Sequence, residues 1–117
     1  MVDIQLGQGD SDNIPVILIE AGTGSDLTGA VVKLILADLA GSFKFEITCS
    51  EGIRDPNTDE IVTEFSAGGI TVPIAGTHTV DDGYLYGEFI VTIGNRQVTF
   101  LNGNNYFVMN VIKKLEN

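Results

Sequence analysis

The sequence is poor in cations. Lys and Arg together number 6, against 16 Asp and Glu, which gives a formal net charge of −10. Binding to nucleic acid requires cations that replace phosphate counterions, and binding to an anionic membrane surface requires them equally. We therefore expect neither nucleic acid nor membrane among the partners. The acidity is interpreted as a source of solubility or, alternatively, of attraction to a basic partner.

Cysteine and histidine each occur once, and tryptophan is absent. Cys49 cannot form an internal disulfide, and it continues the inward face of an apparent strand, so we interpret it as a small core hydrophobe. His78 lies in a polar segment, where we expect a solvated side chain. A hydrolytic triad would need a nucleophile and a carboxylate beside it, and nothing in the sequence singles these out. We predict that the protein is not an enzyme, with no catalytic residue and no cofactor.

No complete metal-ligand set is visible either. Asp55, Asn57 and Asp59 have the spacing that opens an EF-hand calcium loop. The sixth and twelfth positions hold Glu60 and Ser66, where such a loop needs a glycine and a bidentate glutamate. We predict a turn with solvated acids and no metal. Two acidic loops that the fold brings together remain the alternative way to hold a hard cation.

A long hydrophobic run is also missing. The first thirteen residues, MVDIQLGQGDSDN, contain neither a positively charged stretch nor an apolar core of the kind found in signal peptides. We expect no signal peptide and no membrane span, and hence a protein made in the bacterial cytoplasm.

What the sequence does contain is strand patterning, clearest over residues 83–114. Residues alternate with period two from Tyr84 to Ile93, as in a half-buried strand. The predicted inward set is Leu85, Phe89, Val91 and Ile93, and the outward set is Tyr84, Tyr86, Glu88 and Thr92, with Ile90 as an apolar exception. Gly94-Asn95 is a hairpin turn signal, and 102–105 (NGNN) is a second. We predict three sequential antiparallel strands, the last with Phe107, Met109 and Val111 inward.

Further strands are predicted upstream. Residues 2–6 suggest a short edge strand, and 30–37, 60–65 and 70–74 read as strands. The apolar run 14–19 (IPVILI) predicts a strand covered on both faces, with Pro15 at its start or at an edge. Residues 43–49 alternate with Phe43, Phe45, Ile47 and Cys49 inward. The close spacing of short strands predicts one all-β domain over residues 1–117, an immunoglobulin-like antiparallel β-sandwich of about seven to nine strands.

Tyr84, Tyr86 and Ile90 are the candidate contact residues. They are predicted to share the outward face of the central strand, and amphipathic rings are enriched where proteins meet partners or sugars. Two alternatives stay open. Another part of the chain covers these side chains, or they form the stacking platform of a carbohydrate-binding β-sandwich module.

Two segments carry a family resemblance. Asp26-Leu-Thr-Gly-Ala30, which leads into VVKLIL, and Gly83-Tyr-Leu-Tyr-Gly-Glu-Phe89 resemble the N-terminal domain of phage baseplate upper proteins, found in tailed phages of Gram-positive hosts. The family pattern also opens with a Gly-Asp and a Pro-containing strand, matched by Gly9-Asp10 and 14–16. It ends with a turn and a strand, matched by 102–103 and 106–112. Residues 54–76 depart from it.

The resemblance implies a sandwich that acts as a docking module in a phage or prophage tail. The expected function is that of a non-catalytic structural protein of the virion, which docks to the tail hub by protein–protein contact and presents receptor-binding proteins. The expected partners are other tail and baseplate proteins. The family's downstream helix and shaft have no counterpart in these 117 residues, so we expect an isolated chain to be monomeric and to become multimeric in the virion.

Overall fold

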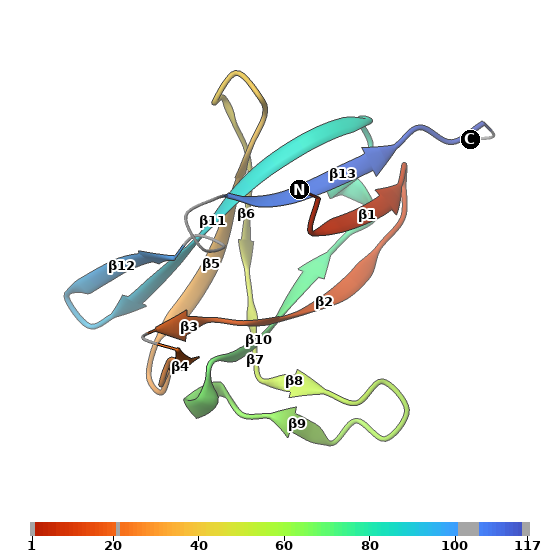
Figure 1. Ribbon diagram of the computed structural model, residues 1–117. Helices are drawn as coiled ribbons and strands as arrows, with labels where there is room; N and C mark the ends of the chain where they lie inside the picture. Colours follow the sequence, from red (N-terminus) through yellow and green to blue (C-terminus); the bar gives the residue numbers. More distant parts are fainter. Residues whose placement is uncertain (1, 21, 101–105, 116–117) are drawn as a thin grey trace.

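The computed structural model describes residues 2–20, 22–100 and 106–115, and within them the chain is all-β, as predicted (Figure 1). The strands are β1 (Ile4–Gly7), β2 (Asp12–Ile17), β3 (Ile19–Glu20), β4 (Thr23–Gly24), β5 (Val31–Ala37), β6 (Phe43–Thr48), β7 (Ser50–Glu51), β8 (Ile53–Arg54), β9 (Ile61–Thr63), β10 (Gly69–Ile74), β11 (Gly83–Ile93), β12 (Arg96–Phe100) and β13 (Phe107–Ile112). Two single turns of 3-10 helix, η1 (Phe65–Ala67) and η2 (Gly76–His78), interrupt them. No helix in this described part is long and apolar enough to cross a membrane.

Strand β11 organises the larger sheet, whose order is β1-β13-β11-β5-β6. One edge of β11 pairs with β13 over Gly83–Gly87 and with β12 over Phe89–Ile93. Strands β12 and β13 therefore lie end to end along the same edge. The opposite edge pairs with β5 over Tyr86–Thr92. The three predicted C-terminal strands are confirmed, but β11 lies at their centre. The turn signal at 102–105 falls outside the described residues.

The predicted N-terminal edge strand is also confirmed as β1. It pairs with β13 in parallel, with Ile4 opposite Met109 and Leu6 opposite Val111. The sequence had suggested a purely antiparallel sandwich, and this parallel pair is an exception to it. Asp3 fixes the start of this pair, because its backbone N–H donates to the Val108 carbonyl and its carboxylate accepts the Val108 N–H at 2.8 Å.

The smaller sheet has the order β2-β10-β7. Pro15 lies on the edge strand β2, opposite Thr71, as its missing N–H donor requires. The prediction that 14–19 is covered on both faces is wrong. Ile14 and Leu18 are buried, whereas Ile17 and Ile19 are exposed, because the larger sheet covers β2 on one face only.

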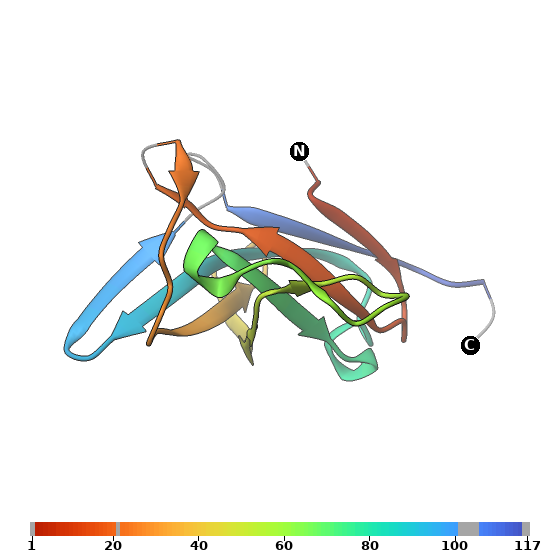
Figure 2. The ribbon, with the colours of Figure 1, turned by 90° about the horizontal axis from the view of Figure 1, so that it is seen from below.

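The core lies between the two sheets, which Figure 2 shows from below with the smaller sheet in front of the larger. It consists of alternate residues of both inner faces: Val32, Leu34, Leu36, Ile47, Phe89, Val91, Phe107, Met109 and Val111 from the larger sheet, and Ile14, Ile70, Val72 and Ile74 from the smaller. Burying alternate apolar residues is what stabilises a two-sheet sandwich.

Leu27 adds to this core from the loop before β5 and is almost fully buried. Its position is set by a local turn. The Asp26 carboxylate accepts the backbone N–H of Thr28 at 3.0 Å and its hydroxyl at 2.6 Å, and Gly29 adopts φ +80°. A residue with a side chain would be strained at that φ.

The β11–β12 hairpin projects from the body of the molecule in both ribbon views (Figures 1 and 2). Gly94 has φ +56° and Asn95 has no positive φ, which is the pattern of a type II′ turn. Ile93 is exposed at the end of this arm, so its predicted inward position is wrong. The alternation is intact, but the smaller sheet does not extend far enough to cover it.

Candidate functional site

The candidate site lies on the outer face of the larger sheet, the face turned away from the core. Paired residues of antiparallel strands point to the same side of a sheet. Tyr86 of β11 pairs with Ala37 of β5, and Ala37 pairs with Phe43 of β6, so these three side chains form one row across three strands. In the next row Glu88 pairs with Ile35. Apolar side chains therefore cluster at one end of a face that is otherwise open to solvent.

Phe43 belongs to this row because of a β-bulge. Leu36 pairs with Phe45, but the next residue, Ala37, pairs with Phe43, so β6 contributes one extra residue at this point. A bulge of this kind reverses the side to which the following side chain points. Phe43 is accordingly 63% exposed, and its predicted inward position is wrong. Phe45 and Ile47 stay on the inner face, as predicted.

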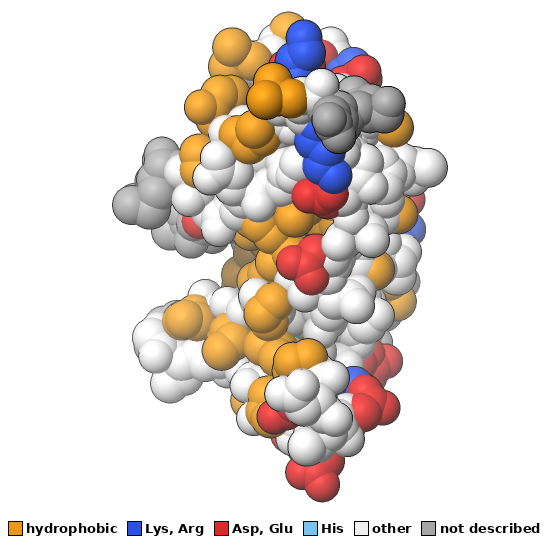
Figure 3. Space-filling view, turned by 90° about the vertical axis from the view of Figure 1, so that its right-hand side faces the viewer, with side chains coloured by type: hydrophobic (Ala, Val, Ile, Leu, Met, Phe, Trp, Pro, Cys, Tyr) orange, Lys and Arg blue, Asp and Glu red, His pale blue; other side chains and the backbone are white. Residues whose placement is uncertain are grey.

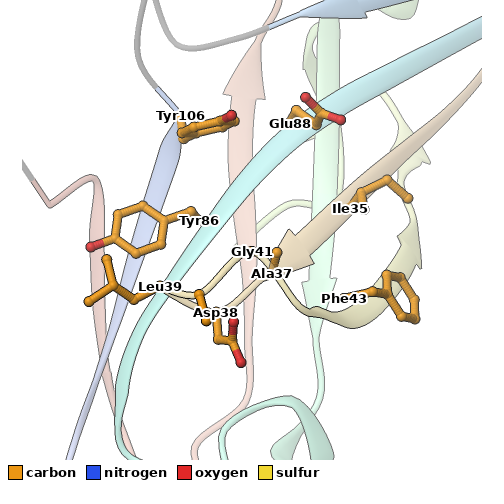
Figure 4. Close-up of a pocket in the computed structure, with 10 residues that line it drawn as sticks. Ile35, Ala37, Asp38, Leu39, Gly41, Phe43, Tyr86, Glu88 and Tyr106 are labelled. Atoms are coloured by element: carbon orange, nitrogen blue, oxygen red, sulfur yellow. The ribbon is translucent and has the colours of Figure 1, made fainter.

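These side chains border a hollow of about 580 Å³. Its walls come from three strands, β5, β6 and β11, from Tyr106, the residue before β13, and from the β5–β6 loop, whose Leu39 is 82% exposed. In Figure 4, Tyr86 and Tyr106 lie at one side of the hollow, and Ile35 and Phe43 lie at the other. The two tyrosine rings meet edge to face, with centroids 6.5 Å apart and an interplanar angle of 72°.

Asp38 builds the loop that closes one end of the hollow. Its carboxylate accepts the backbone N–H of Ser42 at 2.9 Å, and its backbone carbonyl accepts that of Gly41 at 2.9 Å. Gly41 adopts φ +83°, which an L side chain would resist. The loop that carries Leu39 is thus held by local hydrogen bonds.

Some charged side chains on this face form ion pairs, and one does not. Lys44 is 3.7 Å from Asp38, and Lys33 is 3.5 Å from Glu46. Glu88 projects from the same face half-buried, and it forms no hydrogen bond or ion pair with any residue that the structure describes. The outer face therefore presents one carboxylate that is available to a ligand, next to two aromatic rings.

Of the three predicted contact residues, only Tyr86 lines this hollow. Tyr84 is exposed two residues earlier on the same face and borders a second hollow of about 230 Å³ with Asp81 and Asp82. Ile90 is half-buried further along β11, opposite Lys33. The three residues share a face, as predicted, but the structure does not bring them together into one contact patch.

Sequence reasoning missed Phe43 and Tyr106 as members of the site. Tyr106 could have been found by extending the alternation of β13 backwards, because Val108 pairs with Tyr86 and Tyr106 is two residues before it. Glu88 was placed on the correct face. Its lack of a partner among the described residues is a property of the folded sheet, which no local pattern indicates.

His78 is partly exposed, so the expected solvated side chain is only partly right, and the side chain also makes structural contacts. Its Nδ1 accepts the backbone N–H of Ala75 at 2.9 Å, and its ring packs edge to face on Phe45 with centroids 5.0 Å apart. Burial lowers the pKa of His78, because a desolvated imidazole resists protonation. The neighbouring Thr79, which sequence reasoning also missed, is fully buried.

Cys49 is buried in the core, as predicted, and burial raises the pKa of its thiol to about 12. The segment at 55–59 is a turn. The Asp55 carboxylate accepts the backbone N–H groups of Asn57 and Thr58, and Arg54 donates to the Asp59 carbonyl at 2.8 Å. Over the described ranges of the chain, no three His, Cys, Asp or Glu side chains are grouped so that they could hold a metal ion.

Figure 3 shows how charge and apolar surface are distributed on the side at the right of Figure 1. Acidic side chains gather at its lower end, where the β8–β9 hairpin lies, and hydrophobic side chains gather at its upper end and in an indentation across its middle. The acidic excess is thus not confined to the rim of the hollow.

Comparison with known proteins rests on structure. No protein-family model matches the chain, and no curated protein matches it. Among solved structures, the N-terminal domain of phage TP901-1 ORF48, a baseplate upper protein, superposes with a TM-score of 0.58 at 13% sequence identity. The match covers 95% of this chain and 83% of that one. A family 123 glycoside hydrolase from Clostridium perfringens gives a TM-score of 0.46 at 10% identity, and the match covers 97% of this chain and 23% of the hydrolase chain. The chain is therefore similar in fold to the N-terminal domain of a phage baseplate upper protein, as the sequence resemblance had predicted.

Proposed function

We propose that this protein is a non-catalytic structural component of a phage or prophage tail baseplate. The supporting observation is the fold it shares with the TP901-1 ORF48 domain over nearly its whole length. The structural roles of His78 and Cys49 are in keeping with this, because each is engaged in packing. In this proposal the chain docks to the tail hub, presents receptor-binding proteins and resides in the virion tail.

Immunogold electron microscopy of particles from the encoding phage or prophage tests this proposal. We expect the label at the end of the tail that bears the baseplate, and we expect the chain in the mass spectrum of purified particles. A chain that is abundant in the lysate but absent from purified particles contradicts the proposal.

The assembly state is a separate part of the proposal. We expect the isolated chain to be monomeric in dilute solution and to become multimeric only in the virion. Its charge of −10 disfavours contact between identical surfaces. A stable symmetric contact needs roughly 800 Å² per partner. Light scattering at micromolar concentration and moderate salt measures this, and a stable trimer would refute it.

A carbohydrate-binding role is the second candidate, because two tyrosines and two carboxylates border the hollow on the outer face. It predicts strong binding on a glycan array that is lost in Tyr86→Ala. The matched control is Tyr84→Ala, which removes an exposed tyrosine from the same face but outside the hollow. Binding lost in the first variant and kept in the second would place this role above the structural one.

A further inference from the structure

We propose that the hollow on the outer face binds a cationic side chain, Arg or Lys, of a protein partner. This inference deepens the proposed docking role and rests on it, since it takes the ligand to belong to a protein. The ligand would lie against Tyr86 and Tyr106 and pair with Glu88.

The aromatic geometry favours a compact cation. The rings of Tyr86 and Tyr106 are inclined at 72°, so together they form a corner and not a flat platform. Stacking of a pyranose ring uses an exposed, flat aromatic face. A guanidinium or ammonium group is attracted to the faces of aromatic rings within about 6 Å, from more than one direction. Tyr106 is 53% exposed, which leaves it accessible to an incoming side chain.

The charge of the site favours a cation as well. Lys33 and Lys44 do not line the hollow, and each is already paired, Lys33 with Glu46 and Lys44 with Asp38. Glu88 is left half-buried without a partner in the described chain. A charge-assisted hydrogen bond to a partly desolvated carboxylate is stronger than one in bulk water. Arg would gain more than Lys, because its planar fork can bind a carboxylate with two hydrogen bonds and stack on a ring simultaneously.

The net charge of −10 adds long-range attraction. A negative field raises the rate at which a cationic segment meets the surface, and it disfavours acidic partners. A neutral sugar would gain nothing from it. Charge complementarity therefore selects a basic protein segment over a glycan as the occupant of this hollow.

Nuclear magnetic resonance with the ¹⁵N-labelled chain tests the proposal. The probes are N-acetylargininamide, N-acetylglutaminamide and a methyl glycoside, each titrated to millimolar concentration at low salt. We expect the arginine probe alone to shift amide signals, and we expect the shifts to concentrate at Ile35, Tyr86, Glu88 and Tyr106.

Two variants and one control locate the binding. Glu88→Gln keeps the shape of the side chain and should weaken binding of the arginine probe about fivefold, because the charge pair is partly exposed. Tyr106→Ala removes an exposed ring and should weaken it similarly. Glu60→Gln makes the same charge change on the exposed β8–β9 connection and should leave affinity unchanged.

The remaining outcomes overturn the proposal. Shifts from the methyl glycoside at these amides, without shifts from arginine, would assign the hollow to sugar. Arginine shifts scattered over the acidic surface, or equal losses in Glu88→Gln and Glu60→Gln, would mean unspecific attraction. No shift from any probe would mean that the hollow is not a ligand site, while immunogold labelling of the tail would still decide the structural role independently.

Discussion

Thr79→Val is the substitution whose effect follows most directly from the structure. Thr79 is fully buried, and its hydroxyl donates to the Asp10 carbonyl at 2.7 Å, across 69 residues of sequence. The Gly76 carbonyl is an alternative acceptor at 3.2 Å, and the Thr79 carbonyl accepts the Gly9 N–H at 3.0 Å. Thr79 thus joins η2 to the loop between β1 and β2. Valine has the same shape but cannot donate, so the Asp10 carbonyl loses its donor.

The cost can be worked out from these contacts. Leaving a buried acceptor without its donor costs about 1–3 kcal/mol, and the added buried methyl offsets up to about 1 kcal/mol. Because this hydrogen bond is only part-buried, we take the middle of the range that is left. A net loss of about 1–2 kcal/mol remains. Unfolding entropy of about 2.1 cal/mol/K per residue gives roughly 0.25 kcal/mol/K for a chain of this length, so Tm should fall by about 4–8 °C.

Thermal unfolding followed by circular dichroism measures this shift. Thr77→Val is the matched control, because Thr77 is exposed in the same turn and its side chain forms no hydrogen bond within the described residues. We expect it to change Tm by less than about 2 °C. A Thr79→Val protein that melts at or above the temperature of the unsubstituted chain would refute the view that this hydroxyl anchors η2.

Three further predictions concern the core, the thiol and the imidazole. Leu34→Ala, at a fully buried position, should lower the free energy of unfolding in urea by about 2–5 kcal/mol, whereas Ile35→Ala on the outer face should cost clearly less. Cys49 should not react with a thiol reagent at pH 8 until the protein is unfolded, because burial raises its pKa to about 12; fast labelling of the native state would contradict this. His78 has a folded-state pKa below its unfolded one, so its contribution to stability is present above pH 6.5 and is lost as the pH falls through the folded-state pKa. Urea denaturation at several pH values should show this loss of stability. His78→Gln should reduce the slope of unfolding free energy against pH.

The sequence predicted best where one face of a strand is buried and the other is not. Strand β11 shows this, since Phe89 and Val91 are buried and Tyr86 and Glu88 are only half-buried on the opposite face. Period two is then imposed directly by the core. The prediction that the run 14–19 is covered on both faces failed because this run shows no alternation. A continuous apolar segment does not reveal whether one or both faces of its strand are covered, and β2 is covered on one face only.

The site was less predictable because it depends on pairing between strands. Phe43 and Phe45 are both aromatic, so alternation alone cannot show that a bulge places them on opposite faces. The position of Tyr106 beside Tyr86 requires β13 to lie along the first half of β11. That in turn requires β12 to occupy the second half, which is a property of the assembled sheet.

Two parts of the outer face of the larger sheet differ in polarity, and this difference supports the proposed docking role. Along β6, the outward residues Lys44, Glu46 and Thr48 are polar, as expected of a sheet surface that meets only water. The end of the same face near the β5–β6 loop carries aromatic and aliphatic side chains, and there the bulge adds Phe43 and the loop adds Leu39. Exposed apolar side chains that are scattered singly are normal on a protein surface, whereas a cluster of them marks an interaction site. A chain that needed only a soluble sheet would have no physical reason to place them at one end. This cluster, with Glu88 in the neighbouring row, is therefore where a partner is most usefully sought.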